Sequence, residues 1–300
     1  MQNLSSHKPL AILLISLTGF ILSVGCNTII SPDPVIEVPR DEAPAWSPDG
    51  NYIAYNHFNP EADEHTNPFG LYVLDLETGE RNLVIEGPAF NPEWSPDGEW
   101  IAFNSNDIFK IRPDRSDLEK ITDIGNAFFP AWSSDGDKIA FDTSHENERG
   151  ANTIWIMDQD GTNLIKIIDP VEGEVRNPDW SPDNKFIVHY RYLTEKAGSE
   201  IFVMDTSGEN SMRLTETENG ISNRSPNWSP DGDWIAWHTN NGIWVMRSDG
   251  SDQQHLVNGE TPSWSPDSQR IVFSKPTPDE SKVVLWIMNN DGSGLEQITF

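Results

Sequence analysis

Short apolar runs recur along the chain, and each is bounded by Pro, Gly, Asp or Ser. Runs such as 101–103 and 201–204 are too short for helices and are rich in Ile, Val and aromatic residues. A short run that is apolar at every position is typical of a strand covered on both faces. Helical periodicity is absent after the N-terminal segment. The pattern therefore predicts an all-β protein made of small sheets that are buried on both sides.

The runs belong to a repeat that occurs six times. Each copy has a Trp, a Ser-Pro-Asp-Gly-like turn, an Ile-Ala-Phe-like run and, further on, an aromatic-apolar-Met/Leu-Asp run. The Trp positions are Trp46, Trp94, Trp132, Trp180, Trp228 and Trp264. Repeats of about 40 residues built from short strands are typical of β-propellers, in which each repeat is one four-stranded blade. We therefore predict a six-bladed β-propeller of four-stranded antiparallel blades, with blades at about 41–86, 87–124, 125–170, 171–217, 218–258 and 259–300.

The second copy shows how one repeat makes one blade. The innermost strand ends at Trp94, and 95–98 reads Ser-Pro-Asp-Gly, which favours a type I turn. The second strand is expected at 100–103, the third at 108–111 and the outer strand at 118–122. The last outer strand is expected at 295–300, so the ring should close without exchanging strands between blades.

The N-terminal 25 residues are typical of an export signal. Lys8 precedes an apolar stretch from Leu10 to Val24, which is followed by Gly25 and Cys26, the sole cysteine. The sequence Leu-Ser-Val-Gly-Cys at 22–26 resembles the lipobox of bacterial lipoproteins, although Ser23 stands where a large aliphatic residue is usual. This resemblance implies lipidation at Cys26, a tether over 26–40 and a propeller over 41–300. A plain signal peptide with an incidental Cys is the alternative.

The chain is strongly acidic, with a formal net charge of -28 from 48 acidic and 20 basic residues. Such a charge repels nucleic acids and anionic lipid surfaces. We therefore expect no nucleic-acid partner, and contact with a membrane only through the lipid. Because Asp is also favoured in the turns of the repeat, the charge alone does not indicate a cationic partner.

The repeat resembles that of the TolB-type propellers, which are related to WD repeats. The resemblance rests on Trp-Ser-Pro-Asp-Gly, Ile-Ala-Phe, Ile-Trp-Val-Met and Asp-Gly, and it covers about residues 40–300. TolB carries an α/β domain before its propeller and works in the periplasm with the lipoprotein Pal. The stretch between Cys26 and the first repeat is too short for that domain. Together with the lipobox-like sequence at Cys26, the resemblance leads us to expect a monomeric, lipid-anchored propeller on the periplasmic side of the cell envelope or at the cell surface, bound to an envelope protein or peptide.

Candidate binding residues follow from the connections that vary in length. Those between second and third strands differ between copies, and we expect binding on the end of the propeller where they emerge, at 57–68, 144–152, 191–199 and 275–282. Ten residues after each Trp stand Asn56, Asn104, Asp142, Tyr190, His238 and Ser274. With His57, His65 and His145, these residues make up the predicted binding set. The alternative is that they are ordinary strand-end residues facing water.

Enzymatic alternatives have weaker support. Several histidines are expected at the same end, where oligogalacturonate lyases, a TolB-like group, hold a metal. However, the chain has no His-x-His, His-Glu-x-x-His, Gly-x-Ser-x-Gly or Asp-x-Asp-x-Asp-Gly motif. We therefore expect no catalytic residues, metal or cofactor. The leading hypothesis is a non-enzymatic binding scaffold; the rivals are a metal-dependent glycan lyase and a purely structural component of an envelope complex.

Overall fold

A computed structural model describes residues 38–60, 68–147, 150–168, 173–195, 197–218 and 220–300. These residues form 24 strands in one compact unit that spans Glu37–Phe300. The predicted export signal, Cys26 and His65 lie outside the described residues. Within the described part of the chain, no helix has the length and apolar character needed to cross a membrane.

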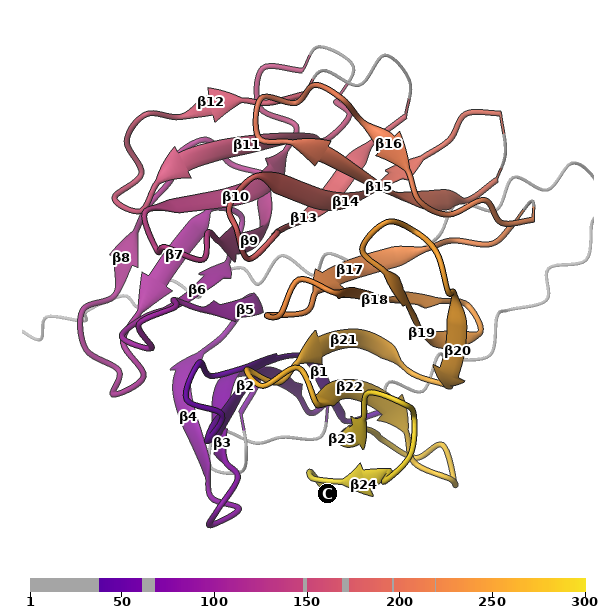
Figure 1. The fold of residues 1–300 in the computed structure, drawn as a ribbon. Coiled ribbons are helices and arrows are strands. Elements are labelled where there is room, and N and C mark those ends of the chain that lie inside the picture. Colours follow the sequence, from indigo (N-terminus) through magenta and orange to yellow (C-terminus); the bar gives the residue numbers. More distant parts are fainter. Residues whose placement is uncertain (1–37, 61–67, 148–149, 169–172, 196, 219) are drawn as a thin grey trace, which may run out of the picture. The chain divides into compact units, whose positions relative to one another are not determined.

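Four blades are separate sheets of four antiparallel strands, each built from consecutive strands (Figure 1). The second repeat contains β5 (Phe90–Trp94), β6 (Ile101–Asn104), β7 (Ile108–Ile111) and β8 (Glu119–Lys120). The third contains β9 (Ala127–Trp132), β10 (Lys138–Thr143), β11 (Thr153–Asp158) and β12 (Ile165–Lys166). The fourth contains β13 (Val175–Trp180), β14 (Phe186–Tyr192), β15 (Ser199–Asp205) and β16 (Met212–Arg213). The fifth contains β17 (Arg224–Trp228), β18 (Trp234–Thr239), β19 (Gly242–Arg247) and β20 (Gln254–Val257).

The first and last repeats share one eight-stranded sheet, so the prediction of six separate blades is wrong in its count: four blades stand alone. The first repeat contains β1 (Arg40–Trp46), β2 (Tyr52–Phe58), β3 (Gly70–Asp75) and β4 (Arg81–Glu86). The last contains β21 (Glu260–Trp264), β22 (Arg270–Pro276), β23 (Val283–Asn289) and β24 (Glu296–Gln297).

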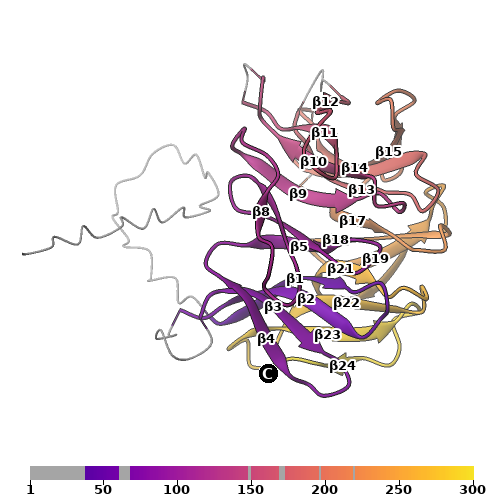
Figure 2. The same cartoon turned by 90° about the vertical axis from the view of Figure 1, so that its left-hand side faces the viewer.

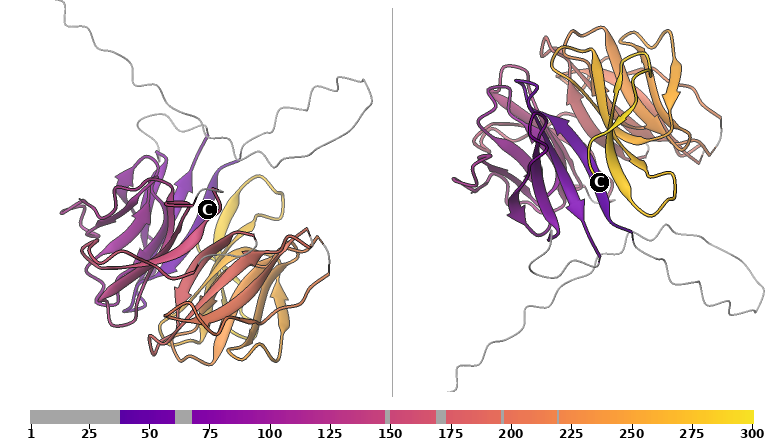
Figure 3. Two further views of the ribbon diagram at one scale, coloured as in Figure 1. Left: turned by 90° about the horizontal axis from the view of Figure 1, so that it is seen from above. Right: turned by 90° about the horizontal axis from the view of Figure 1, so that it is seen from below.

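A single parallel pairing joins these two repeats. Arg40 of β1 lies opposite Val283 of β23, and the Val283 N–H donates to the Pro39 carbonyl at 2.9 Å. Figures 2 and 3 show the indigo and yellow strands as neighbours. We predicted that the ring closes without exchanging strands between blades, and that prediction did not include this pairing between the first and last repeats.

The first strands of the repeats meet around a common centre. Contacts run in the cyclic order β1, β5, β9, β13, β17 and β21, and from β21 back to β1. Figure 1 shows these strands innermost and the fourth strands outermost. The hydrophobic clusters lie between consecutive sheets: Trp180 and Ile187 of the fourth repeat, for example, pack with Ile154 and Ile156 of the third. Both faces of each sheet are thus covered by its neighbours, as the all-apolar runs predicted.

The Ser-Pro-Asp-Gly turns form as the sequence predicts. In the second repeat, the Gly98 N–H donates to the Ser95 carbonyl at 2.8 Å, and the Trp100 N–H donates to Ser95 Oγ at 2.9 Å. Asp97 accepts from the Ser95 hydroxyl and from the Glu99 N–H. Gly98 has a φ of 72°, which glycine adopts at little cost. The Asp residues of the repeat therefore have a structural role in the turns.

In four repeats the outer strand is only two residues long, which is shorter than the strands predicted at 118–122 and 295–300. In three of these, a threonine hydroxyl just beyond the strand accepts the N–H of a third-strand residue at 2.9 Å. The pairs are Ile108 with Thr122, Ile201 with Thr215, and Leu285 with Thr299. In these repeats the threonine hydroxyl takes the place of the next backbone acceptor, so the pairing between the third and outer strands stops after two residues.

The two ends of the sheets differ in regularity. The connections from first to second strands, at 47–51, 95–100, 133–137, 181–185, 229–233 and 265–269, hardly vary. We call this end the turn rim. The connections from second to third strands range from 240–241 to 59–69. We call this end the loop rim. The predicted concentration of length variation at one end is confirmed.

Trp180 tests the packing between repeats. Its side chain is 6 % exposed, and its indole N–H donates to the Ala131 carbonyl of the preceding repeat at 3.1 Å. We expect Trp180→Ala to lower the free energy of unfolding by about 3 to 5 kcal/mol, the usual cost of emptying a large aromatic site. Urea unfolding measures this. Phe186→Ala, which alters a side chain that is 42 % exposed, should cost far less, and equal losses would contradict the packing role.

Candidate functional site

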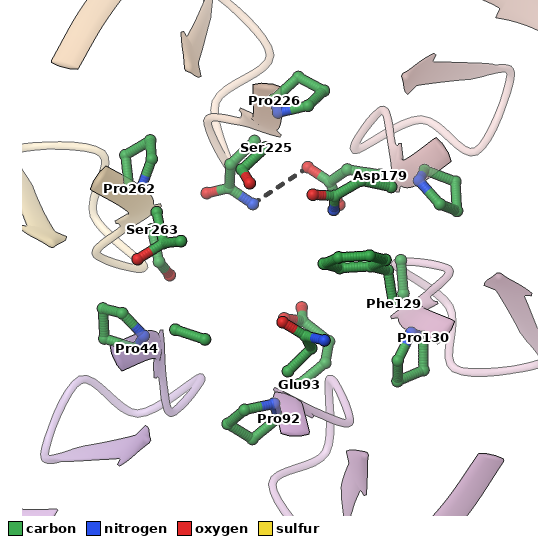
Figure 4. A pocket seen from close by; sticks show the side chains of 17 residues that line it. Pro44, Pro92, Glu93, Phe129, Pro130, Asp179, Ser225, Pro226, Pro262 and Ser263 are labelled. Atoms are coloured by element: carbon green, nitrogen blue, oxygen red, sulfur yellow. Dashed lines mark hydrogen bonds between the residues drawn. The ribbon is translucent and has the colours of Figure 1, made fainter. Parts of the chain in front are cut away.

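A strained backbone position recurs in every first strand. Each first strand contains a Pro, and the residue directly before it has a φ of 47° to 52°. This is a left-handed backbone conformation that is uncommon outside glycine. Each coincides with a shift of register between first and second strands. The six residues are Ala43, Asn91, Phe129, Asn177, Ser225 and Thr261. Such bulges bend a strand and free the following position for Pro, which has no N–H to pair. They line the centre of the ring (Figure 4).

Four residues of the predicted binding set hold these bulges in place. Each accepts the backbone N–H of the bulged residue in the next repeat: Asn56 from Asn91 at 3.0 Å, Asn104 from Phe129 at 3.3 Å, Asp142 from Asn177 at 3.0 Å, and His238 Nδ1 from Thr261 at 3.3 Å. Asn56, Asn104 and Asp142 are buried, and His238 is half-buried. These side chains therefore link neighbouring repeats. Whether any also contacts a ligand stays a prediction.

Tyr190 and Ser274 occupy the same position without that bond. The Ser274 hydroxyl hydrogen-bonds to Thr261 Oγ1 at 2.6 Å. The Tyr190 side chain is 5 % exposed, and its hydroxyl makes no hydrogen bond with the described residues. The junction between the fourth and fifth repeats thus has a phenol where four other junctions have an acceptor for the bulged N–H.

Two carboxyl groups face the centre of the ring. Glu93 and Asp179 each precede the Trp of their repeat, and Figure 4 shows both side chains in the channel. Asp179 accepts from the Trp228 N–H at 2.6 Å and from Asn227 Nδ2 at 3.1 Å. Burial raises the pKa of Asp179 to about 7, against the effect of these donors. Burial, and then the charge of Asp179, raise the pKa of Glu93 to about 8. The channel therefore titrates near neutral pH.

A wider cavity of about 390 Å³ opens from the channel toward the turn rim. It is lined by the Trp residues of all six repeats and by Glu93, Asp179, Asn227 and Ser263. Five of the six Trp side chains are at most 7 % exposed. The Trp ring therefore belongs to the core, and the polar side chains supply the chemistry of this cavity.

His57 belongs to a buried ionic cluster in the first repeat. Its Nδ1 lies 2.6 Å from Asp41 Oδ1, and Arg81 Nη2 lies 3.1 Å from the same oxygen. Arg81 Nε also donates to the Tyr55 hydroxyl at 2.6 Å. His57 is 6 % exposed. The buried Asp41 carboxylate thus has two partners, His57 and Arg81, and such pairing is what a charge in a protein interior requires.

The structure does not bring the predicted histidines together. His57, His145 and His238 stand on the first, third and fifth repeats. His145 contacts the Trp155 ring edge-on at a centroid distance of 5.6 Å. Across the described ranges, no group of three or more His, Cys, Asp or Glu side chains is arranged to hold a metal ion.

Sequence reasoning missed Glu93 and Asp179. The signal was available, because the residue before each Trp is Ala45, Glu93, Ala131, Asp179, Asn227 or Ser263. Four of these are polar where a strand core would be apolar, and all four line the centre of the ring. The reason for these polar residues becomes clear only when the structure shows where the centre of the ring lies.

Comparisons with known proteins agree with this architecture. A family profile described as the TolB beta propeller domain matches residues 115–299. The uncharacterized protein Atu1656 of Agrobacterium fabrum is 32 % identical over 163 residues, which cover 49 % of this chain and 54 % of that protein. The chain thus spans about half the length of this relative.

Solved structures give the same result. A protein of Agrobacterium tumefaciens provisionally assigned as TolB has a TM-score of 0.64 and 25 % identity, covering 76 % of this chain and 87 % of that one. TolB from Acinetobacter baumannii has a TM-score of 0.68 and 22 % identity, covering 81 % and 62 %. An oligogalacturonate lyase from Vibrio parahaemolyticus shares the fold, with a TM-score of 0.59, 14 % identity and coverage of 87 % and 78 %.

The raised pKa of Glu93 predicts a pH-dependent stability. The unfolded carboxyl loses its proton near pH 4.5, whereas the folded one keeps it to about pH 8. The free energy of unfolding should therefore fall as pH rises through this window, by about 1.4 kcal/mol per unit of pKa difference. Glu93→Gln should be more stable than the wild type at pH 8 and equal to it below pH 4.5.

Urea unfolding between pH 4 and pH 9 measures this difference. The exposed Glu77→Gln is the matched control and should leave the pH profile unchanged. An unaltered profile in Glu93→Gln would show that the Glu93 carboxyl is not destabilised by its surroundings.

Proposed function

This chain belongs to the TolB beta-propeller domain family, and on that premise we propose that it is a non-enzymatic scaffold that binds a protein or peptide of the cell envelope at its loop rim. The scaffold would present six repeats around one axis. It would be held by a lipid on Cys26 at the periplasmic side of the envelope or at the cell surface.

One observation carries the binding proposal. The turn rim is nearly identical in all repeats, whereas the connections of the loop rim range from two residues, 240–241, to eleven, 59–69. Loops of different length on a rigid scaffold are where recognition is usually placed. Asn56, Asn104 and Asp142 of the predicted set supply hydrogen bonds between repeats, which keep the scaffold rigid.

The loops offer a direct test. In the last repeat, 277–282 joins β22 to β23, and 240–241 makes the same connection in the fifth repeat. We expect replacement of 277–282 by Asn-Asn, the sequence at 240–241, to weaken capture of the envelope partner at least tenfold. Pulldown from detergent-solubilised envelopes, with quantitative mass spectrometry, measures this.

The matched control is Asp249→Asn in a hairpin of the turn rim, which should leave capture unchanged. Equal loss in both variants, or in neither, would contradict binding at the loop rim. Metal analysis after dialysis covers the lyase-like alternative: one equivalent of transition metal, lost in both His145→Ala and His238→Ala, would favour that enzyme.

The anchor is tested separately. Cys26→Ala should abolish acylation and release the propeller from the membrane fraction as a soluble exported protein, because the chain has no other thiol. Mass spectrometry of the mature N-terminus checks this. A mature, unmodified N-terminus at another residue would contradict lipid anchoring.

A further inference from the structure

Six equivalent residues stand where the first strands begin at the loop rim, one position before the bulges. In ring order they are Glu42, Phe90, Phe128, Arg176, Arg224 and Glu260. Their chemistry is sorted into three sectors of neighbouring repeats: two acids, two phenylalanines and two arginines. Burial raises the pKa of Glu42, against the charge of Arg40, which lies 3.5 Å away, and the charge of Glu260 adds to the rise. The mouth of the channel is therefore polarised, with a basic sector in an otherwise acidic protein.

The arginines of this sector have spare hydrogen-bonding capacity. Arg224 makes no ion pair with the described residues, and its guanidinium lies 5.8 Å from the centre of the Tyr192 ring. Arg176 donates through Nε to Glu174 at 2.8 Å, and its two terminal nitrogens have no partner in the described chain. On the turn rim, by comparison, Arg112 is 3.1 Å from both Glu99 and Asp117.

Tyr190 lies between the two arginines. Its strand position pairs with Arg176, and its ring meets that of Tyr192 at 5.6 Å. Burial raises the pKa of the Tyr190 hydroxyl, as do Tyr192 and the charge of Asp142, and the charges of Arg176 and Arg224 oppose this shift. This hydroxyl makes no hydrogen bond with the described residues, and it does not accept the N–H of a bulged residue as the equivalent side chains of four other repeats do.

His238 adds a further donor. Its strand position pairs with Arg224, and its Nδ1 accepts the Thr261 N–H. Burial, and then the charge of Arg224, lower the pKa of His238 to about 4, so the ring is neutral at pH 7. With Nδ1 as acceptor, the proton lies on Nε2. The two arginines thus stand on strand positions opposite the phenol and the imidazole. Glu174 is ion-paired with Arg176, and the charge of the buried Asp142 carboxylate also acts on Arg176 and Tyr190, whereas Arg224 has no carboxylate partner among the described residues.

We propose that this sector, formed by Arg176, Tyr190, Arg224 and His238, binds a carboxylate of a peptide or protein partner. Arginine presents paired donors that match the two oxygens of a carboxylate. The neighbouring Phe128 and Phe129 supply an apolar surface for the residue beside that carboxylate; Figure 4 shows Phe129 facing the channel.

A singly charged carboxylate fits this site better than a phosphate dianion, because the protein's net charge of -28 opposes each negative charge of a ligand. The inference rests on the proposed function and adds the chemistry of the partner.

A library of random 12-residue peptides displayed on phage tests the proposal. Panning on the wild type should enrich peptides with Asp or Glu next to an apolar residue. For a synthetic peptide of the selected sequence, Arg224→Gln should raise the Kd at least tenfold, and Tyr190→Phe should raise it several-fold. Arg112→Gln, which removes the same charge from the turn rim, is the matched control and should leave the Kd within twofold.

Neutralising the peptide carboxylate, by Asp→Asn or Glu→Gln, should weaken binding to the wild type tenfold. The same change should have little further effect on Arg224→Gln, because both remove one interaction. Melting temperatures of Arg224→Gln and Tyr190→Phe close to that of the wild type establish that the variants are folded.

The other outcomes are distinct. Enrichment of basic peptides, or a Kd that does not depend on Arg224 and Tyr190, overturns the carboxylate site and leaves the peptide scaffold intact. Absence of any enriched peptide overturns both the site and the proposed function. Displacement of the selected peptide by trigalacturonate at lower concentration than the peptide's own Kd assigns the site to a sugar acid and overturns a peptide occupant.

Discussion

Each first strand has one residue more than its partner strand can pair, and the ring depends on how the backbone N–H of that residue is satisfied. A buried N–H without an acceptor is costly, so a bulge in the centre of a protein requires a partner for it. At four junctions, a polar side chain of the preceding repeat is that partner. The same hydrogen bond therefore stabilises the strained residue and links two sheets. It also explains why polar residues are buried in otherwise apolar second strands.

This constraint determines where the structure is free to vary. Asn56, Asn104 and Asp142 are committed to neighbouring repeats, so a ligand that recruited them would have to break a junction. Tyr190 has no such commitment. Its hydroxyl makes no hydrogen bond with the described residues, its strand position lies opposite Arg176, and Arg224 lies over the ring of Tyr192. Tyr190 thus departs from the pattern of the repeat, and the proposed site is built around this departure.

The sequence predicts most of the fold, because the repeat encodes local chemistry. The Ser95–Gly98 turn and the third strand 108–111 form as expected, since Ser, Pro, Asp and Gly each favour their place in the turn and the apolar runs must be covered on both faces. The number of separate sheets was not predictable in this way. The pairing of Arg40 with Val283 joins residues far apart in the chain, and no local pattern marks it. The site was only partly predictable: Tyr190 and His238 were found by their spacing from Trp, but Arg176 and Arg224 gain meaning only when the ring brings their strands together.

The pairing of the first and last repeats has a mechanical consequence. The chain enters the ring through Pro39 and Arg40, and the Pro39 carbonyl is the acceptor for the Val283 N–H. Any tension along the N-terminal segment acts first on this bond and on the short parallel pairing beside it. The place where the ring closes is therefore also the place where load enters it. A pull on the N-terminus would therefore strain the boundary between the first and last repeats before it reached any other sheet.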